Sequence, residues 1–166
     1  MKIKLVTLFL IFSLALPFAA HAATGEGETV IKVVSTFYTG YIKSLETSDR
    51  TYRWRVQPEV DPSFVSKIDA LIDKAKKEDG FLGYDPILMA QDWPREKMEY
   101  ATPIIKGNTA EIIAYTVWSG DKVPLCVTLA SKEGAWRITD IIDMRWFEGE
   151  EAFECGGLKK APNGKK

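Results

Sequence analysis

The stretch that decides the fold is residues 98–143, which read MEYATPIIKGNTAEIIAYTVWSGDKVPLCVTLASKEGAWRITDIID. Three short connections interrupt it, and each combines glycine with asparagine, aspartate or serine: Lys106-Gly107-Asn108, Ser119-Gly120-Asp121 and Ser131-Lys132-Glu133-Gly134. Glycine tolerates positive φ, and short polar side chains bond their own backbone, so these residues favour tight turns. The runs between them are rich in Ile, Val, Tyr, Thr and Trp, which favour strands. The stretch predicts an antiparallel meander with strands at about 98–105, 109–118, 122–130 and 135–143.

The middle strands indicate how this sheet is covered. Residues 109–118 are apolar on both faces, with Ile112 on one and Ile113 on the other. That pattern is expected of a strand covered on both sides or facing another subunit, so it also allows a homodimer through the sheet. Pro124 has no N–H to donate, which predicts an edge or a bulge at the start of the third strand.

Two amphipathic helices are predicted before the sheet. From Thr29 onward, apolar residues recur every three or four positions: Val30, Val33, Phe37, Tyr41 and Leu45. The second helix opens at Asp61-Pro62, with the aspartate as N-cap and the proline in the first turn, and it ends at Gly80. The sequence therefore predicts an α+β fold in which N-terminal helices pack on a curved antiparallel sheet of four or more strands.

The first 22 residues have the pattern of a secretory signal peptide. A basic start is followed by an apolar run over residues 5–18 and then by Ala20-His21-Ala22, which predicts cleavage before Ala23. The apolar run is too short for a comfortable bilayer span and no second one follows, so no membrane span is predicted. We expect a periplasmic or secreted protein, with a single domain over residues 23–147 and a C-terminal tail over residues 148–166.

Cleavage would also remove His21, the only histidine. Without it, the chain cannot form Ser-His-Asp or Cys-His nucleophile systems or zinc sites with histidine ligands. We therefore predict no catalytic residues, no metal and no cofactor. Loss of Lys2 and Lys4 would change the formal charge from −1 to −3. This weak acidic balance favours neither nucleic acid nor an anionic membrane as the partner.

Two cysteines remain after cleavage, Cys126 and Cys155. In an exported protein an even pair favours a disulfide over a catalytic thiol, so we predict that these two residues are bonded. Closing a loop of about thirty residues would contribute roughly 3–4 kcal/mol of stability.

The candidate binding segment is FLGYDPILMAQDWP, residues 81–94. Asp85-Pro86 repeats the helix-opening pattern, which predicts a capping role for Asp85, worth about 1 kcal/mol, and a short helical turn at 87–91. Polar groups lie beside aromatic rings here, as a small pocket needs. We predict that five residues bind a ligand or partner: Tyr84, Asp85, Gln91, Asp92 and Trp93. The alternative is that Asp85 is only a cap and the later residues only form a turn.

Residues 50–56 alternate basic with aromatic side chains. One interpretation is a stacking platform for single-stranded nucleic acid. The interpretation that we favour, given the acidic balance of the chain, is an extended connector whose Tyr52 and Trp54 pack inward while the arginines stay in water.

The order of elements resembles the nuclear transport factor 2-like superfamily, in which a curved sheet wraps the helices into a cone. The stretch GAWRITDI, residues 134–141, looks like the terminal strand of that superfamily. Phe37-Tyr38 with Tyr41, and the segment from Asp85 to Asp92, resemble a group of uncharacterised exported bacterial proteins. The resemblance covers residues 30–143.

Members of the superfamily include isomerases, dehydratases and cyclases, and also proteins that only bind ligands or other proteins. A dehydratase-type Asp-His arrangement is excluded by the missing histidine. An isomerase would need an Asp base and a Tyr donor, residue types that are present but match no motif position. The sequence favours an exported binding or interaction protein, such as an inhibitor or immunity-type partner of a toxin or envelope enzyme. The alternative is a carrier of a small apolar or polar molecule, or an isomerase-like enzyme, that uses the cone cavity.

Overall fold

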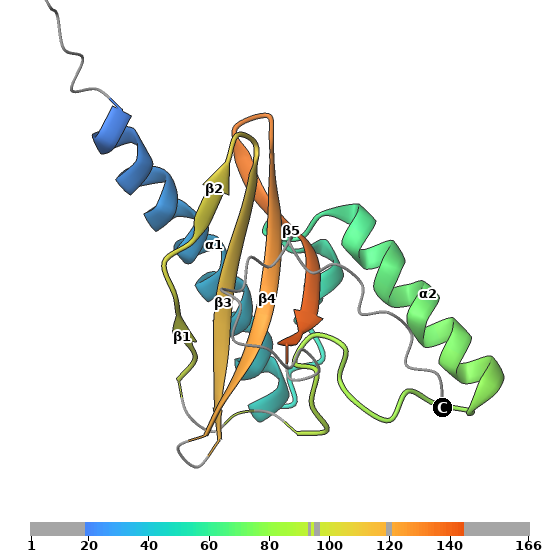
Figure 1. Cartoon of the computed structure of the whole chain (residues 1–166). Helices are drawn as coiled ribbons and strands as arrows, with labels where there is room; N and C mark the ends of the chain where they lie inside the picture. Colours follow the sequence, from blue (N-terminus) through green and yellow to red (C-terminus); the bar gives the residue numbers. More distant parts are fainter. Residues whose placement is uncertain (1–18, 93, 95–96, 119–120, 145–166) are drawn as a thin grey trace, which may run out of the picture.

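The computed structural model describes residues 19–92, 94, 97–118 and 121–144. Two α-helices and a short 3₁₀ helix precede five strands (Figure 1). The elements are α1 (Ala19–Glu46), η1 (Trp54–Val56), α2 (Pro62–Glu78), β1 (Glu99–Tyr100), β2 (Ile104–Lys106), β3 (Thr109–Trp118), β4 (Asp121–Lys132) and β5 (Ala135–Asp143). The predicted α+β fold, with helices packed on a curved antiparallel sheet, is confirmed.

The strands form one antiparallel sheet in the order β1-β3-β4-β5, and β2 also pairs with β3. The prediction of a single strand over residues 98–105 is therefore wrong. This stretch forms two strands, β1 and β2, which both pair with β3. Pro103 lies in the gap and has no N–H for the ladder, whereas Ala101 still donates its N–H to the carbonyl of Ile113 at 2.9 Å. The other three strands are confirmed, with β4 extending over residues 121–132.

Pro124 lies in the part of strand β4 that pairs with β3 but not with β5. The β4–β5 pairing ends at Leu125 opposite Asp143, and Pro124 pairs only with Tyr115 of β3. The missing N–H therefore costs no β5 hydrogen bond, as the predicted edge position requires. A separate irregularity lies between Thr128 and Leu129, where the register to β5 shifts.

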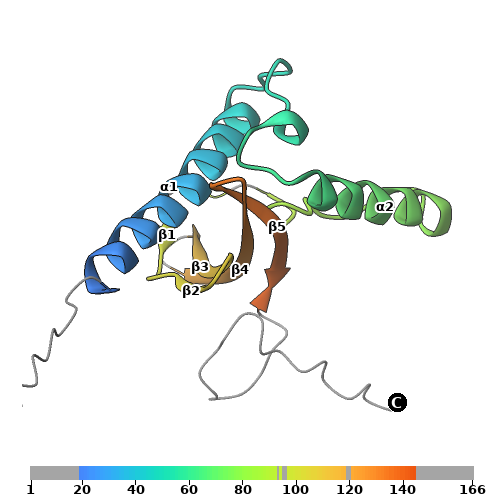
Figure 2. The same ribbon diagram turned by 90° about the horizontal axis from the view of Figure 1, so that it is seen from above.

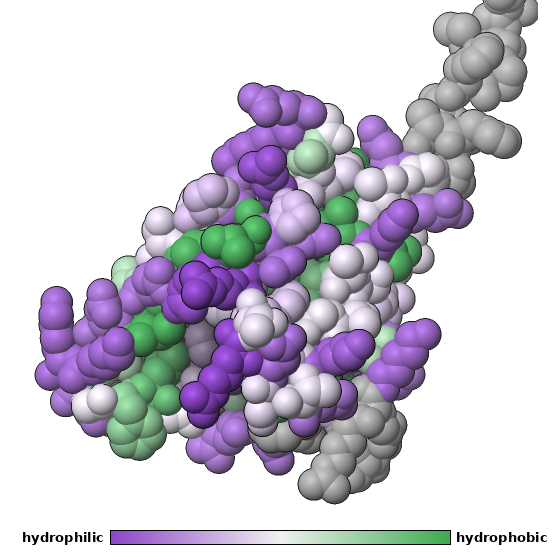
Figure 3. Space-filling view, turned by 180° about the vertical axis from the view of Figure 1, so that it is seen from behind, coloured by the Kyte–Doolittle hydropathy of each residue, from purple (hydrophilic) through white to green (hydrophobic). Residues whose placement is uncertain are grey.

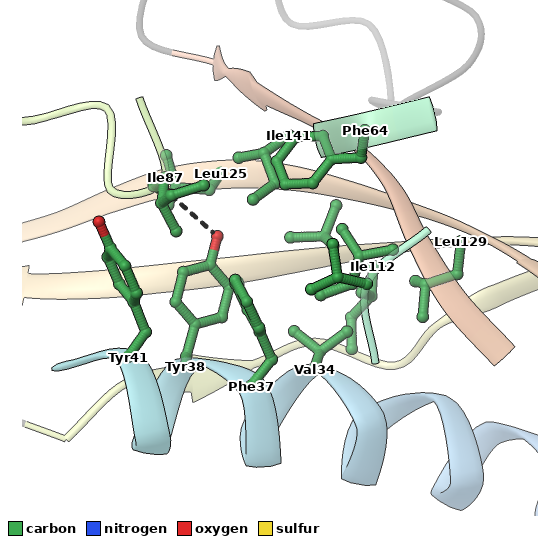
Figure 4. Close-up of a cluster of buried hydrophobic side chains, with 14 of the residues drawn as sticks. Val34, Phe37, Tyr38, Tyr41, Phe64, Ile87, Ile112, Leu125, Leu129 and Ile141 are labelled. Atoms are coloured by element: carbon green, nitrogen blue, oxygen red, sulfur yellow. Dashed lines mark hydrogen bonds between the residues drawn. The ribbon is translucent and has the colours of Figure 1, made fainter. Parts of the chain in front are cut away.

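The core lies between the concave face of the sheet and the helices. Figure 2 shows the sheet curling, with α1 across its open side and α2 leaving at an angle. Strand β3 turns Ile112 and Ala114 into the core, where both are buried, while Ile113 on the opposite face is only partly buried. Side chains from α1, α2 and the sheet meet there (Figure 4): Val34, Phe37, Tyr38, Phe64, Ile112, Leu125, Leu129 and Ile141.

Helix α1 begins at Ala19 and runs through the predicted cleavage position without a break. It therefore starts ten residues before the predicted Thr29, and signal-peptide cleavage stays a prediction because residues 1–18 lie outside the described part. Within that part, neither helix combines the length and the apolar content that a bilayer crossing needs.

The connection after α1 packs its aromatic side chains onto the helices. Tyr52 donates its hydroxyl to the carbonyl of Phe37 at 3.4 Å, and its ring lies so close to Gly40 that a Cβ there would sit 2.9 Å away. Trp54 contacts Phe64 of α2 at a centroid distance of 6.0 Å. The predicted inward packing of Tyr52 and Trp54 is confirmed, but the prediction that this connection is extended throughout is wrong. Trp54–Val56 form a 3₁₀ turn instead, closed by N–H groups that donate to Arg53 and Trp54 carbonyls.

Asp61 joins α2 to the far hairpin of the sheet. It is 2% exposed, and its carboxylate accepts from the N–H of Ser63 at 2.9 Å, the Ser63 hydroxyl at 2.6 Å and Lys132 Nζ at 2.7 Å. Its own N–H donates to the carbonyl of Ile138 at 2.9 Å. The hydrogen bond from Lys132, with those from Ser63, lowers the pKa of Asp61 from 3.8 to about 2. The predicted N-cap is confirmed, and it carries an ion pair as well.

Asp61→Asn should therefore lower stability only where the carboxylate is ionised. The pKa of Asp61 is lower in the folded protein than in the unfolded chain, so its ionised carboxylate stabilises the fold at pH values above the pKa of the unfolded chain. This contribution is lost as the pH falls towards the folded-state pKa of about 2. Urea unfolding should show a loss of about 1–2 kcal/mol at pH 7 that vanishes near pH 2. Asp69→Asn is the control, because Asp69 pairs with Arg55 while 47% exposed and should lose less than about 1 kcal/mol. An Asp61→Asn deficit that is constant with pH would contradict the ion-pair explanation.

Cys126 lies fully buried on the face of β4 that points away from the helices. It packs in a small second cluster with Met144, Ile113 and Ile142. Its predicted disulfide partner, Cys155, lies outside the described residues, as does the predicted tail over residues 148–166. The disulfide therefore stays a prediction.

Candidate functional site

Asp85 holds the predicted binding segment against α1. Its Oδ1 accepts from the backbone N–H of Ile87 at 2.7 Å and of Leu88 at 3.1 Å. Its Oδ2 accepts from the hydroxyl of Tyr41 at 2.6 Å. Asp85 thus caps the turn as predicted, and it also anchors the turn to a helix more than forty residues earlier.

The turn itself differs from the predicted helix at 87–91. Asp85 and Ala90 form an isolated antiparallel bridge, in which the N–H of Asp85 donates to the carbonyl of Ala90 at 2.7 Å. Met89 has φ +51°, in the left-handed region, which stops a right-handed helical turn from continuing. The segment is therefore a closed loop, and the helical prediction is wrong.

The loop covers two buried tyrosines of α1. Tyr38 is fully buried and donates its hydroxyl to the carbonyl of Ile87 at 3.3 Å (Figure 4). Burial, followed by the neighbouring Tyr100 and Asp85, raises the pKa of Tyr38 well above its ordinary 10.0. Burial and Asp85 likewise raise the pKa of Tyr41. Both phenols therefore stay protonated at neutral pH and serve as fixed donors within the fold.

Three of the other predicted binding residues are exposed. Tyr84 is 39% exposed, and Gln91 and Asp92 are exposed as well. Trp93 lies outside the described residues. Asp85 turns toward α1, whereas Tyr84, Gln91 and Asp92 are exposed. The structure thus brings Asp85 together with Tyr41, which was not among the predicted binding residues. A binding role for the predicted residues stays a prediction.

A groove of about 440 Å³ lies between the second half of α1 and the chain that leads into β1. Its apolar and aromatic lining includes Tyr38, Ile42, Met98 and Tyr100. The polar residues that line it within the described part of the chain are Ser35, Thr39, Lys43, Glu46, Thr47 and Lys97, and Pro94 lines it as well. Concave surfaces with an apolar floor and a few polar groups are the usual form of binding sites.

The groove adjoins the predicted segment, although sequence reasoning did not find it. Tyr38 contributes to both, since its side chain lines the groove and its hydroxyl reaches Ile87. Gln91 and Asp92 precede Pro94 by three and two residues, so chain geometry keeps their Cα atoms within about 11 Å of that wall. Gln91 and Asp92 are therefore near the groove along the chain, although neither is among the described residues that line it.

The described surface offers few other candidates. The exposed large apolar side chains are Val56, Phe81, Tyr84 and Ile104. On the face shown in Figure 3, hydrophobic residues form separate patches among hydrophilic ones. The part of the chain that the structure describes contains no group of three His, Cys, Asp or Glu side chains placed to hold a metal ion. The groove is thus the strongest site for a partner or ligand.

Comparison with known proteins identifies a fold and no sequence family. No family model matches the chain, and no curated protein sequence matches it. A chain of the native type VI effector–immunity complex Tae3–Tai3 from Ralstonia pickettii has a similar fold, with a TM-score of 0.50 and 18% identity. That match covers 70% of this chain and 96% of the other.

A chain from the selenomethionine crystal of the same complex gives a TM-score of 0.49 and 20% identity, covering 70% of this chain and 97% of that one. The resemblance to the nuclear transport factor 2-like superfamily stays a prediction. What the comparisons establish is a likeness of fold to a chain of an effector–immunity complex.

Proposed function

We propose that the protein is exported and binds a protein partner, as an immunity-type inhibitor of a toxin or envelope enzyme. The observation that carries this proposal is the fold shared with a chain of the Tae3–Tai3 complex, over 96% of that chain. The predicted signal peptide, with cleavage before Ala23, supports action in the periplasm or outside the cell.

The composition favours the inhibitor role over the toxin role. Toxins that cut envelope polymers need an activated nucleophile or a metal-bound water, and both commonly depend on histidine. The only histidine, His21, lies in the predicted signal peptide. Asp85, the acid nearest the tyrosines, already accepts three hydrogen bonds and does not line the groove.

The groove and its rim are the surface that we assign to the partner. Gln91 and Asp92 are exposed shortly before Pro94, which lines the groove, and polar residues of α1 line it as well. A partner that buries such polar groups needs hydrogen bonds to them. Gln91→Ala and Asp92→Asn should therefore weaken binding by about 1–3 kcal/mol without unfolding the domain.

The test uses the full-length protein, exported through its own N-terminus and captured with its partner from an envelope extract. Mass spectrometry identifies the partner, and calorimetry with the purified pair compares the variants. Asp73→Asn, on the exposed side of α2, is the control and should bind normally. If the captured protein is no toxin or envelope enzyme, or if its activity is unchanged by binding, the proposed function is wrong.

A second candidate function is the binding of a small molecule in the same groove. The volume of about 440 Å³ supports it, because it falls within the range of ordinary ligand sites. Native mass spectrometry of the exported protein would then show a retained compound. An isomerase-like activity has less support, since Asp85, the carboxylate beside the buried tyrosines, accepts a hydrogen bond from Tyr41 and does not line the groove.

A further inference from the structure

We propose that the groove receives two neighbouring side chains of the partner protein, one acidic and one apolar. Lys43 and Lys97 would form ion pairs with the carboxylate, and the apolar side chain would pack on the groove floor formed by Ile42, Met98 and Tyr100. The inference rests on the proposed function, because it names the chemistry of the partner segment that this site would take.

The first argument is that two lysines without a short ion pair lie together at the groove, whereas Lys32 and Lys77, which also have none among the described residues, do not line it. Five lysines elsewhere lie within ion-pair distance of a carboxylate: Lys67 with Asp140, Lys74 with Glu78, Lys76 with Asp73, Lys122 with Glu99 and Lys132 with Asp61. Lys43 and Lys97 both line the groove and are exposed, and neither has such a pair within the described residues. Two unpaired ammonium groups at one groove favour a carboxylate as the ligand.

The charge of the lining groups agrees with an anionic ligand. Among the described residues that line the groove, Glu46 is the one acidic residue, against the two lysines. These described lining residues carry a net charge of +1, whereas the whole chain carries −1. Because the site is positive on an acidic protein, the attraction is local to the groove and does not come from the overall charge.

The floor supplies the apolar part of the recognition. Met98 is buried, Ile42 and Tyr100 are partly buried, and all three line the groove. The hydroxyl of Tyr100 has no hydrogen-bond partner in the described part of the chain. Burial raises the pKa of Tyr100 to about 12, so the hydroxyl remains a neutral donor at physiological pH. An apolar side chain of the partner can therefore pack against Ile42, Met98 and the ring of Tyr100.

The test titrates three blocked tetrapeptides into the isotopically labelled protein and follows the methyl signals of Ile42 and Met98. The peptides are Gly-Phe-Glu-Gly and the same sequence with Gln or Lys in place of Glu. We expect the glutamate peptide to bind about fivefold more tightly than the glutamine peptide, and the lysine peptide to bind most weakly. The double variant Lys43→Gln/Lys97→Gln should remove this preference, and added salt should reduce it.

Lys77→Gln is the matched control, because Lys77 is exposed on α2 and does not line the groove. It should keep the preference for glutamate. Equal affinity for the three peptides, or no binding up to about 10 mM, overturns the proposal. So does tighter binding of free phenylpropionate than of the glutamate peptide, since that result identifies a small-molecule site.

Failure of this inference can be told apart from failure of the proposed function. If the wild-type and Lys43→Gln/Lys97→Gln proteins bind the captured partner equally, the partner docks elsewhere and only the groove assignment is wrong. If the partner is not a toxin or envelope enzyme, the proposed function fails, and the peptide titration still decides whether the groove prefers a carboxylate.

Discussion

Asp85→Ala is expected to lower the free energy of unfolding by about 3–5 kcal/mol, well above the 1 kcal/mol of a lost cap. The substitution leaves three donors without their acceptor: the N–H groups of Ile87 and Leu88 and the hydroxyl of Tyr41. Tyr41 is 8% exposed, and Ile87 and Leu88 are 1% exposed, so water cannot readily replace the carboxylate. Urea denaturation of the purified variants measures the loss.

Two further variants separate the contributions at Asp85. Asp85→Asn keeps an oxygen for the backbone N–H groups but loses the charge that faces Tyr41, so it should cost about 1–2 kcal/mol. Tyr41→Phe removes the phenol, and in that background Asp85→Asn should cost less. A loss of only about 1 kcal/mol for Asp85→Ala would show that the contact with Tyr41 contributes little.

Phe37→Ala is expected to cost about 3–5 kcal/mol, as is usual for removing a buried aromatic ring. Phe37 is 1% exposed and lies in the centre of the aromatic cluster on α1. Its ring meets Tyr38 edge-on at a centroid distance of 5.4 Å and stacks on Tyr41 at 6.0 Å. The cavity would therefore open beneath both tyrosines that hold the loop at Asp85.

Phe81→Ala is the matched control, because the same atoms are removed from a side chain that is 70% exposed. It should change stability by no more than about 0.5 kcal/mol. Thermal and urea unfolding of the two variants make the comparison. Similar losses for Phe37→Ala and Phe81→Ala would contradict the placement of Phe37 in the core.

Local sequence chemistry was sufficient to predict most of the fold. The turns at Gly107 and Gly134 need positive φ, and the structure gives 61° and 78° there. Asp61-Pro62 opens α2 as predicted, because a cap and the proline that follows it act within one turn. These signals depend on neighbours in the chain, so they can be seen without knowledge of the tertiary structure.

The errors occurred where distant residues decide the outcome. The strand predicted at 98–105 has suitable residues on either side of Pro103, but it pairs with β3 as two separate strands, and Pro103, which has no N–H, lies between them. Asp85 was predicted as a cap, but its bond to Tyr41 depends on how α1 crosses the sheet. The groove is lined by residues of two distant stretches, from Ser35 to Thr47 and from Pro94 to Tyr100, and no residue pattern in either stretch predicts that they meet. No periodicity in the sequence could reveal that they meet.

The contact between Asp61 and β5 has a consequence for the order of folding. The hairpins β3–β4 and β4–β5 join strands through short turns, so they can form early, because closing a short loop costs little entropy. Asp61 and Lys132 are 71 residues apart, and their pairing waits until α2 meets the finished hairpin. Weakening that late contact should speed unfolding more than it slows refolding. The lifetime of the folded state, which is set by the unfolding rate, would then depend on Asp61 more than the folding rate does.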